Sequence, residues 1–191
     1  NIALGAGGEN GSAITDQHRI CIDNIVLEKT SAPEIDVPVG KNLITNSEFE
    51  MSEDGSLAGW ENAVTAPGDA TFEAGDGKIT YSVENVGEAD WNIQLKQMGL
   101  SLEQGESYTL KCTLVSDVDR VVKVAVMTPS AGYAWHGGED VVLTAGEAKD
   151  VTLTITPKEE VFTDGITVDT GAGLFFSMGY VEGYTLGAHT V

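Results

Sequence analysis

The sequence predicts an all-β sandwich. Short runs in which apolar and polar residues alternate recur along the 191 residues, and Gly, Asp, Asn or Pro separates them, a pattern typical of β-sandwich domains. No stretch of 11 or more residues keeps its apolar positions at helical spacing. The alternating runs amount to about ten short strands, which fits both a Greek-key sandwich and a jelly roll.

One clear strand is expected ahead of the main domain, at residues 18–29, where isoleucines alternate with polar residues. Residues 30–40 contain two prolines and little periodicity, so they are expected to form a linker. The main domain is expected to span residues 41–191. With 41 % hydrophobic residues in the chain, it can bury a core of its own.

The main domain is expected to open with an extended stretch at residues 41–50. Gly59-Trp60 follows after a polar loop. Residues 70–74 and 78–86 then predict a β-hairpin, because both runs alternate and Asp76-Gly77 between them is a strong signal for a two-residue turn.

Residues 91–116 are the most informative stretch of the chain. A strand is expected at 91–95 and a turn at 103–106, which contains a glycine. A second strand is expected at 107–116, where every other residue is apolar, so that one face is buried. Residues 129–138 are rich in glycine and are expected to form a loop. The remaining strands are expected at residues 120–128, 140–143, 149–156 and 173–180.

The formal net charge of −20 comes from 10 basic and 30 acidic residues. It argues against nucleic acids and anionic membrane surfaces as partners, because both attract positive charge. A neutral ligand such as a glycan, or a cation, fits better. The alternative is that the acidity only keeps an extracellular protein in solution. No apolar run approaches the ~18–20 residues that a membrane helix needs.

Both cysteines, Cys21 and Cys112, lie inside alternating runs. Buried free thiols are the expected state, because cysteine packs as a small hydrophobic residue. A disulfide stays open as the alternative, since the sequence does not show whether the two Cα atoms lie within roughly 7 Å.

Three motifs stand in an order that is typical of a known family, and a fourth motif of that family lies ahead of them. Residues 42–50 read Asn-Leu-Ile-Thr-Asn-Ser-Glu-Phe-Glu, with Ser47 where that family usually has Gly, and Gly59-Trp60 follows. Residues 91–115 supply a Trp-x-Ile-Gln-Leu strand and a Leu-x-x-Gly-x-x-Tyr-Thr-Leu turn and strand. Residues 22–27, Ile-Asp-Asn-Ile-Val-Leu, match the family's closing strand. Together the motifs resemble the family 4 carbohydrate-binding modules, which have relatives in families 9, 16 and 22.

The closing motif precedes the opening one in this chain. The resemblance therefore implies that residues 1–29 are the tail of an upstream module of the same kind. It also implies that residues 41–191 are a second module, a galactose-binding-domain-like jelly roll without its last strand. An unpaired sheet edge is seldom left open, so residues 18–28 are expected to supply the closing strand and to pair with residues 41–50. They would do so within one chain, as in a circular permutant, or by exchange between two chains.

The resemblance implies a non-catalytic module with a glycan cleft across one sheet. Aromatic rings stack on the flat faces of sugars, and polar side chains meet their hydroxyls. Trp60 is expected in the core. Gln94 and Met127 are expected to line the cleft, and the alternative for both is a position on an ordinary solvated sheet face. The residues expected to bind carbohydrate are Trp91, Gln94, Met127, Tyr133 and Trp135.

The resemblance also implies one structural Ca²⁺. Calcium takes about 6–8 oxygen ligands, which include carboxylates and backbone carbonyls. The matching positions are Asp23, Glu48, Glu50 and the carbonyl of Gly77. The alternative is that these acids are ordinary surface residues.

The function expected from the whole sequence is the targeting of a secreted bacterial polysaccharide-degrading enzyme to β-glucan, namely cellulose, mixed-linkage or β-1,3-glucan. Xylan is the second choice of ligand. Adjacent modules of the same polypeptide are expected as partners, and a strand-exchanged dimer is a further possibility. The rivals are a spacer or cell-surface adhesion domain with the same fold and a glycosidase, for which the sequence offers no distinctive pair of carboxylates.

Overall fold

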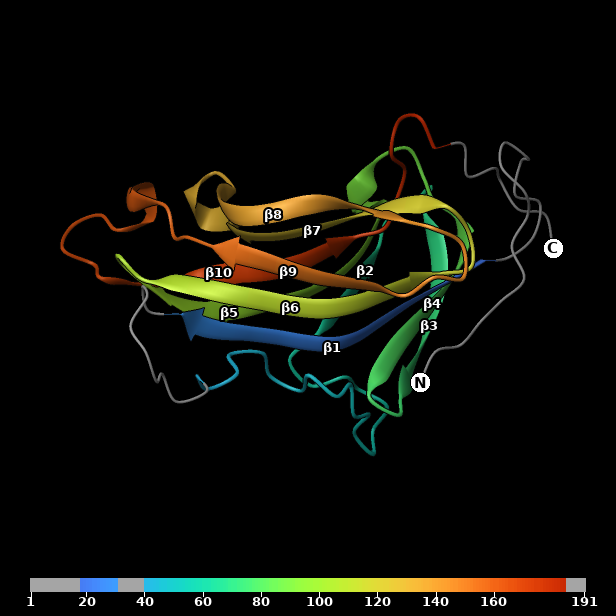
Figure 1. Cartoon of the computed structure of the whole chain (residues 1–191), viewed down its shortest axis with the longest axis horizontal. Helices are drawn as coiled ribbons and strands as arrows, with labels where there is room; N and C mark the ends of the chain where they lie inside the picture. The colour runs from blue at the N-terminus through green and yellow to red at the C-terminus, as the bar shows by residue number, and fades with distance from the viewer. Residues whose placement is uncertain (1–17, 31–39, 185–191) are drawn as a thin grey trace.

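The computed structural model describes residues 18–30 and 40–184. The predicted tail before residue 18, most of the predicted linker and the last seven residues lie outside the described residues. The described part forms two antiparallel five-stranded sheets that pack face to face (Figure 1). The predicted all-β sandwich of two antiparallel sheets is therefore confirmed.

The strands of the two sheets interleave along the chain. The first sheet has the order β3 (Asp69–Gly75), β4 (Lys78–Asn85), β1 (His18–Thr30), β6 (Ser107–Ser116) and β9 (Lys149–Ile155). The second has the order β2 (Glu61–Val64), β5 (Ile93–Glu103), β10 (Val168–Ser177), β7 (Arg120–Thr128) and β8 (Ala134–Leu143). Three short 3₁₀ turns complete the described part: η1 (Asp90–Asn92), η2 (Pro129–Ala131) and η3 (Glu159–Val161).

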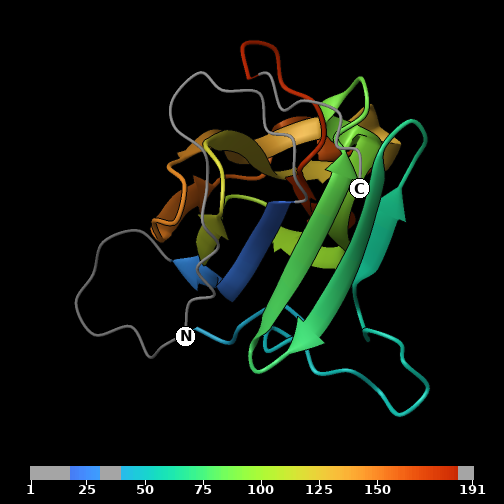
Figure 2. The same cartoon turned by 90° about the vertical axis from the view of Figure 1, so that its right-hand side faces the viewer.

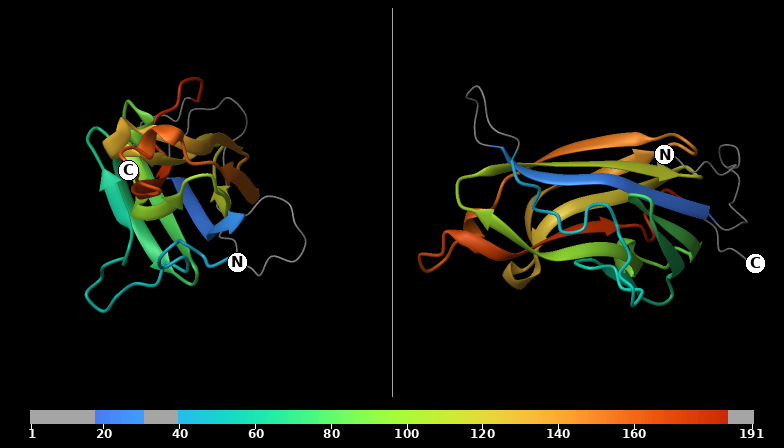
Figure 3. Two further views of the ribbon diagram at one scale, coloured as in Figure 1. Left: turned by 90° about the vertical axis from the view of Figure 1, so that its left-hand side faces the viewer. Right: turned by 90° about the horizontal axis from the view of Figure 1, so that it is seen from below.

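Strand β1 lies in the middle of the first sheet, between β4 and β6, so residues 18–28 do supply a strand of the sandwich (Figure 3). Its register shifts between Asp23 and Val26, and Asn24 adopts a positive φ of 53°. This bulge lets Ile22 and Ile25, three residues apart, both face the core, where they are fully buried. The strand thus contributes a continuous apolar row to the interior.

The expected pairing of β1 with residues 41–50 is wrong. Residues 45–48 form a turn instead of a strand. Two hydrogen bonds nevertheless join residues 42 and 43 to β1. The Leu43 N–H donates to the carbonyl of Leu27 at 2.9 Å, and the Leu27 N–H donates to Oδ1 of Asn42 at 3.2 Å. Asn46 has a positive φ of 51°, which turns the chain away from an extended path.

The predicted hairpin is confirmed as β3 and β4, which stand at the edge of their sheet (Figure 2). Asp76 and Gly77 have φ of 52° and 78°, and Gly75 pairs with Lys78 across them. Two successive positive φ values define the turn that matches the right-handed twist of paired strands. Asp-Gly accommodates this conformation with little strain.

Two expected boundaries differ in the structure. The strand expected at residues 91–95 begins after η1 and continues to Glu103, so Trp91 belongs to a 3₁₀ turn. The loop expected at 129–138 contains η2 and then the start of β8, so Trp135 lies on a strand.

Trp60 belongs to the core, as expected. Its side chain is 8 % exposed, and its ring centroid lies 5.1 Å from that of Phe49 and 6.4 Å from that of Phe176. Its indole N–H donates to the carbonyl of Asn46 at 3.0 Å. The ring thus joins the opening stretch of the domain to β10.

The thiols of Cys21 and Cys112 are both free and buried, so the disulfide alternative is excluded. Cys112 shares the inward face of β6 with Tyr108, Leu110 and Leu114, as the alternation predicts. Burial raises the pKa of the Cys112 thiol to about 12, and the nearby Asp150 carboxylate adds to the effect. Within residues 18–30 and 40–184, no helix is long and apolar enough to cross a bilayer.

Candidate functional site

A cleft of about 700 Å³ lies on the outer face of the second sheet. Side chains of β5, β10 and β7 form its floor, and residues of η1 at one end and of η2 and β8 at the other form its rims. Figure 1 shows both turns projecting on the same side, η1 in green and η2 in gold. The lining residues are Asp90, Trp91, Gln94, Lys96, Met98, Lys123, Met127, Pro129, Tyr133, Trp135, Phe175 and Ser177.

Strand pairing arranges the floor in transverse rows. Gln94 of β5 stands opposite Ser177 of β10, which stands opposite Lys123 of β7. The Gln94 amide donates to the Ser177 hydroxyl at 2.9 Å, and this bond fixes the amide across two strands. Two residues further along β5, Lys96 stands opposite Phe175. Since alternate residues share a face, these rows lie on the side opposite the core.

Two glycines allow large side chains to lie across the floor. A Cβ added to Gly173 would lie 2.4 Å from Sδ of Met98, so Met98 occupies the space above β10. A Cβ added to Gly138 would lie 2.6 Å from Cζ2 of Trp135, so the indole covers that position of β8. Contacts this short are not possible between real atoms. A larger residue at Gly173 would therefore displace Met98, and one at Gly138 would collide with the carbonyl oxygen of Val124 as well as with Trp135.

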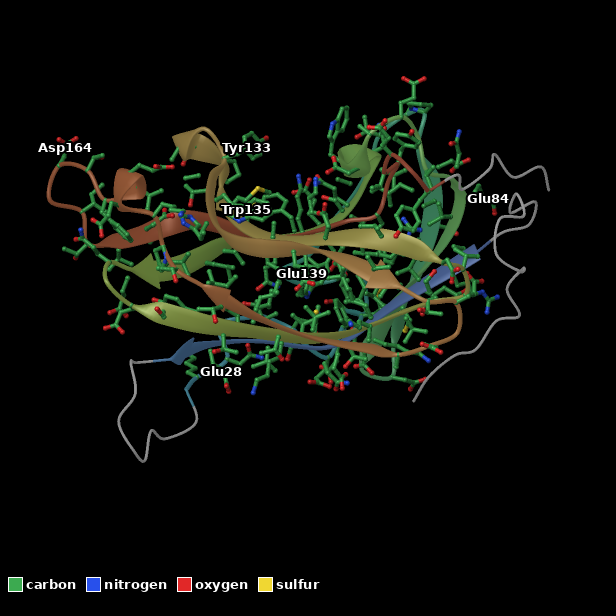
Figure 4. All side chains as sticks on the ribbon, turned by 45° about the horizontal axis from the view of Figure 1, so that its top comes forward. Glu28, Glu84, Tyr133, Trp135, Glu139 and Asp164 are labelled. Carbon is green, nitrogen blue, oxygen red and sulfur yellow. The ribbon has the colours of Figure 1, made fainter. Side chains whose placement is uncertain are left out.

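Three aromatic side chains rise at the two ends of the cleft. Trp91, in η1, is 53 % exposed, whereas Tyr133 and Trp135, at the other end, are 62 % and 40 % exposed. Figure 4 shows Tyr133 and Trp135 beside each other near the η2 turn. Strand pairing also forms a row of Met98, Gly173 and Met127. Four residues separate this row from the Gln94 row, which is about 13 Å along the strand. The aromatic groups therefore bracket a floor of polar and apolar side chains.

Each of the two cleft lysines is paired with a carboxylate. Lys123 contacts Asp90 of η1 in a hydrogen-bonded ion pair, and this bond raises the Lys123 pKa, with burial opposing it. Lys96 Nζ lies 2.9 Å from Oε1 of Glu61 on the edge strand β2. The large negative charge of the chain is therefore not concentrated in the cleft, which offers N–H donors held in fixed directions.

All five residues predicted to bind carbohydrate line this one cleft: Trp91, Gln94, Met127, Tyr133 and Trp135. Sequence reasoning missed Lys96 and Met98, although both follow Gln94 at a spacing of two and so share its face. It also missed Phe175 and Ser177, whose place in the cleft depends on the pairing of β10 with β5.

The four predicted calcium donors are only partly brought together. Glu48 approaches the hairpin turn, because its Oε2 lies 3.4 Å from the position of a Cβ on Gly77. Asp23 pairs with Lys78, the residue after that turn. No three side chains of His, Cys, Asp or Glu in the described part of the chain are placed to hold a metal ion, so Glu50 joins no such group. The calcium site stays a prediction.

Comparisons with known proteins agree with this architecture. A solved structure described as "CBM4 structure and function" superposes with a TM-score of 0.58 at 19 % sequence identity, over 72 % of this chain and 89 % of that chain. This likeness supports the fold. No curated protein matches the chain. A family model described as a carbohydrate binding domain, CBM_4_9, matches residues 41–170, more than half of the chain. The chain therefore belongs to the family 4 and 9 carbohydrate-binding domains, as the order of its motifs predicts.

Proposed function

We propose that the cleft on the second sheet binds a single chain of β-glucan. The observation that carries the proposal is the convergence of three exposed aromatic side chains, Trp91, Tyr133 and Trp135, on one cleft with fixed polar groups on its floor. The family binds carbohydrate without catalysing its cleavage.

The two kinds of lining residue match the two kinds of surface on a pyranose. The flat C–H faces of the ring stack on the indole and phenol rings, which are rigid and lose little conformational entropy on binding. The equatorial hydroxyls meet the Gln94 amide and the ammonium groups of Lys96 and Lys123. A cleft that combines apolar walls with a few oriented polar groups is the usual form of a small-molecule site.

A neutral glycan suits the charges better than an acidic one. The chain carries a net charge of −20, which disfavours the approach of polyanions such as pectin at low ionic strength. Both cleft lysines already have carboxylate partners. β-1,4- and mixed-linkage β-glucans are the preferred ligands, and xylan, which is also neutral along its backbone, is the second choice.

The biological role that follows is targeting. The domain would belong to a secreted bacterial enzyme that degrades polysaccharides, beside further modules of the same polypeptide. A bound module raises the local concentration of the attached enzyme on its substrate. An extracellular setting follows from this role, because polysaccharides of cell walls are found there.

Titration calorimetry with soluble oligosaccharides tests the proposal. The panel contains mixed-linkage, β-1,4- and β-1,3-gluco-oligosaccharides and xylo-oligosaccharides. Truncation of an aromatic anchor typically costs on the order of 2 kcal/mol, so Trp91→Ala and Trp135→Ala should each weaken binding by about tenfold or more. Phe72→Ala, an exposed aromatic on β3 outside the cleft, is the matched control and should bind as the wild type does.

Three outcomes would overturn the proposal in different ways. Undiminished affinity in both folded tryptophan variants would move the site away from this cleft. Absence of binding to every neutral glycan by the wild type would favour a spacer or adhesion domain. Release of reducing sugars from the same oligosaccharides would instead identify a glycosidase.

A further inference from the structure

Three polar side chains are buried behind the Trp135 end of the cleft: Thr128 at the end of β7, His136 on β8 and Asp169 on β10. Burying polar groups is costly unless each finds a hydrogen-bond partner. Their neighbours in sequence include Met127 and Trp135, which line the cleft. The three side chains thus lie on the opposite side of the sheet from the predicted sugar platform.

The hydrogen bonds among them run in one direction. The Lys158 N–H donates to Nδ1 of His136 at 3.0 Å, so the neutral imidazole carries its proton on Nε2. That Nε2–H donates to the Thr128 hydroxyl at 2.7 Å, and the hydroxyl donates to Oδ2 of Asp169. The Gly171 N–H donates to Oδ1 of the same carboxylate at 2.8 Å. Backbone donors at both ends therefore fix every proton in the relay.

His136 is also the extra residue of a β-bulge. Val126 pairs with Gly137, but the next residue, Met127, pairs with Trp135, so His136 has no partner on β7. Without the bulge Met127 would face His136, and Trp135 would point toward the core, because a one-residue change of register moves side chains to the other face. The bulge thus turns Trp135 into the cleft and His136 into the interior.

The main chain of His136 is anchored as well. Its carbonyl, which the bulge leaves without a partner on β7, accepts a hydrogen bond from the Thr156 N–H at 2.9 Å. Together with the bond from Lys158, this ties the bulge to the segment that follows β9. The bulge is therefore held at three points: the carbonyl, Nδ1 and Nε2 of one residue.

We propose that Thr128, His136 and Asp169 are positioning residues that hold the bulge and so aim Trp135 into the cleft. The part of this inference that concerns affinity rests on the proposed glycan function. The part that concerns the orientation of Trp135 does not. A residue of this kind acts through the aromatic platform without contacting the sugar.

The relay predicts a dependence on pH. A second proton on His136 must sit on Nδ1, where it would face the Lys158 N–H, donor against donor. The charged groups around the ring are Asp169 on β10, Glu160 in η3 and Lys158. Burial lowers the His136 pKa and outweighs the two carboxylates, which raise it. His136 is therefore neutral and the relay intact at neutral pH. The ring gains its second proton, and the relay is lost, as the pH falls through the His136 pKa, which lies below the ordinary histidine value of about 6.5.

The orientation of Trp135 can be observed without any ligand. In ¹⁵N–¹H spectra, the Trp135 indole signal is assigned from its loss in Trp135→Phe, and the His136 ring signal is followed from pH 7.5 downward. We expect the Trp135 signal to shift with the same midpoint as His136. Thr128→Val, which keeps the shape but lacks the hydroxyl, should shift the indole signal at neutral pH, and Thr128→Ser should restore it. Thr152→Val, at an exposed position on β9, should have no effect.

The same variants are then titrated with mixed-linkage β-gluco-oligosaccharide. Thr128→Val should weaken binding about tenfold, as expected for a displaced aromatic anchor, whereas Thr128→Ser should bind almost as the wild type does. A Trp135 signal that ignores the titration of His136 in the wild type overturns the proposal, even if Thr128→Val does not fold. Trp135 shifts without any glycan binding would instead keep the positioning role and refute the proposed function.

Discussion

Replacing Trp60 with alanine tests how the structure divides the tryptophans between core and cleft. Trp60 is almost fully enclosed, with Phe49 and Phe176 against its ring. The substitution removes those contacts, leaves a cavity between the sheets and takes the hydrogen bond from the Asn46 carbonyl. Trp91→Ala removes the same side chain from a position that is half exposed.

The two variants should differ greatly in stability. Truncating a buried tryptophan costs about 3–5 kcal/mol, because the transfer free energy is lost and a cavity remains. A surface substitution away from such features stays within about 0.5 kcal/mol. With a urea dependence near 2 kcal/mol/M, Trp60→Ala should lower the unfolding midpoint by about 2 M, and Trp91→Ala should change it by less than about 0.3 M.

Urea unfolding followed by far-UV circular dichroism measures both midpoints. The wild type, Trp60→Ala and Trp91→Ala are compared at one pH and one ionic strength. If Trp91→Ala destabilised the domain as much as Trp60→Ala, Trp91 would be part of the core and could not serve as a free stacking surface. If Trp60→Ala left the midpoint unchanged, the packing described between the two sheets would be wrong.

The remaining predictions concern calcium and β1. If Asp23, Glu48, Glu50 and the Gly77 carbonyl bind Ca²⁺, excess EDTA should lower the melting temperature and Ca²⁺ should restore it. The reason is that a ligand of the folded state stabilises that state by RT ln(1 + [L]/Kd). An identical melting curve in EDTA would refute the calcium site. Deleting residues 1–30 should leave the remaining residues 31–191 unfolded, because β1 supplies the middle of a sheet, and a folded, monomeric 31–191 would show that β1 is dispensable. Size-exclusion chromatography of the full chain distinguishes a monomer from a strand-exchanged dimer.

Local features of this fold could be predicted from the sequence. The Asp76-Gly77 turn and the buried face of β6 follow from residue types that lie next to each other, and both are present. The aromatic residues of the cleft could be named because a family resemblance indicated where a cleft lies. The sequence motifs that establish the family thus also led to the candidate site.

Long-range pairing and bulges could not be predicted in the same way. The alternation in β1 indicates a strand but not its neighbours, and it pairs with β4 and β6 because their apolar faces complete one core. The start of β8 looks like a loop because the bulge at His136 breaks the period of two and Gly137-Gly138 follows. Both glycines are required by packing: a Cβ on Gly137 would lie 2.7 Å from the carbonyl oxygen of Thr154.

The central claim is that glycan binds between Trp91 and Trp135 on the outer face of the second sheet. The chain has three tryptophans, so a ¹⁵N–¹H spectrum contains three indole signals that report on the core and on both ends of the cleft. Titration with mixed-linkage β-gluco-oligosaccharide should shift the signals of Trp91 and Trp135 and leave that of Trp60, which is bonded to Asn46, in place. Three unshifted signals at saturating ligand, or a shift of Trp60 alone, would contradict the account.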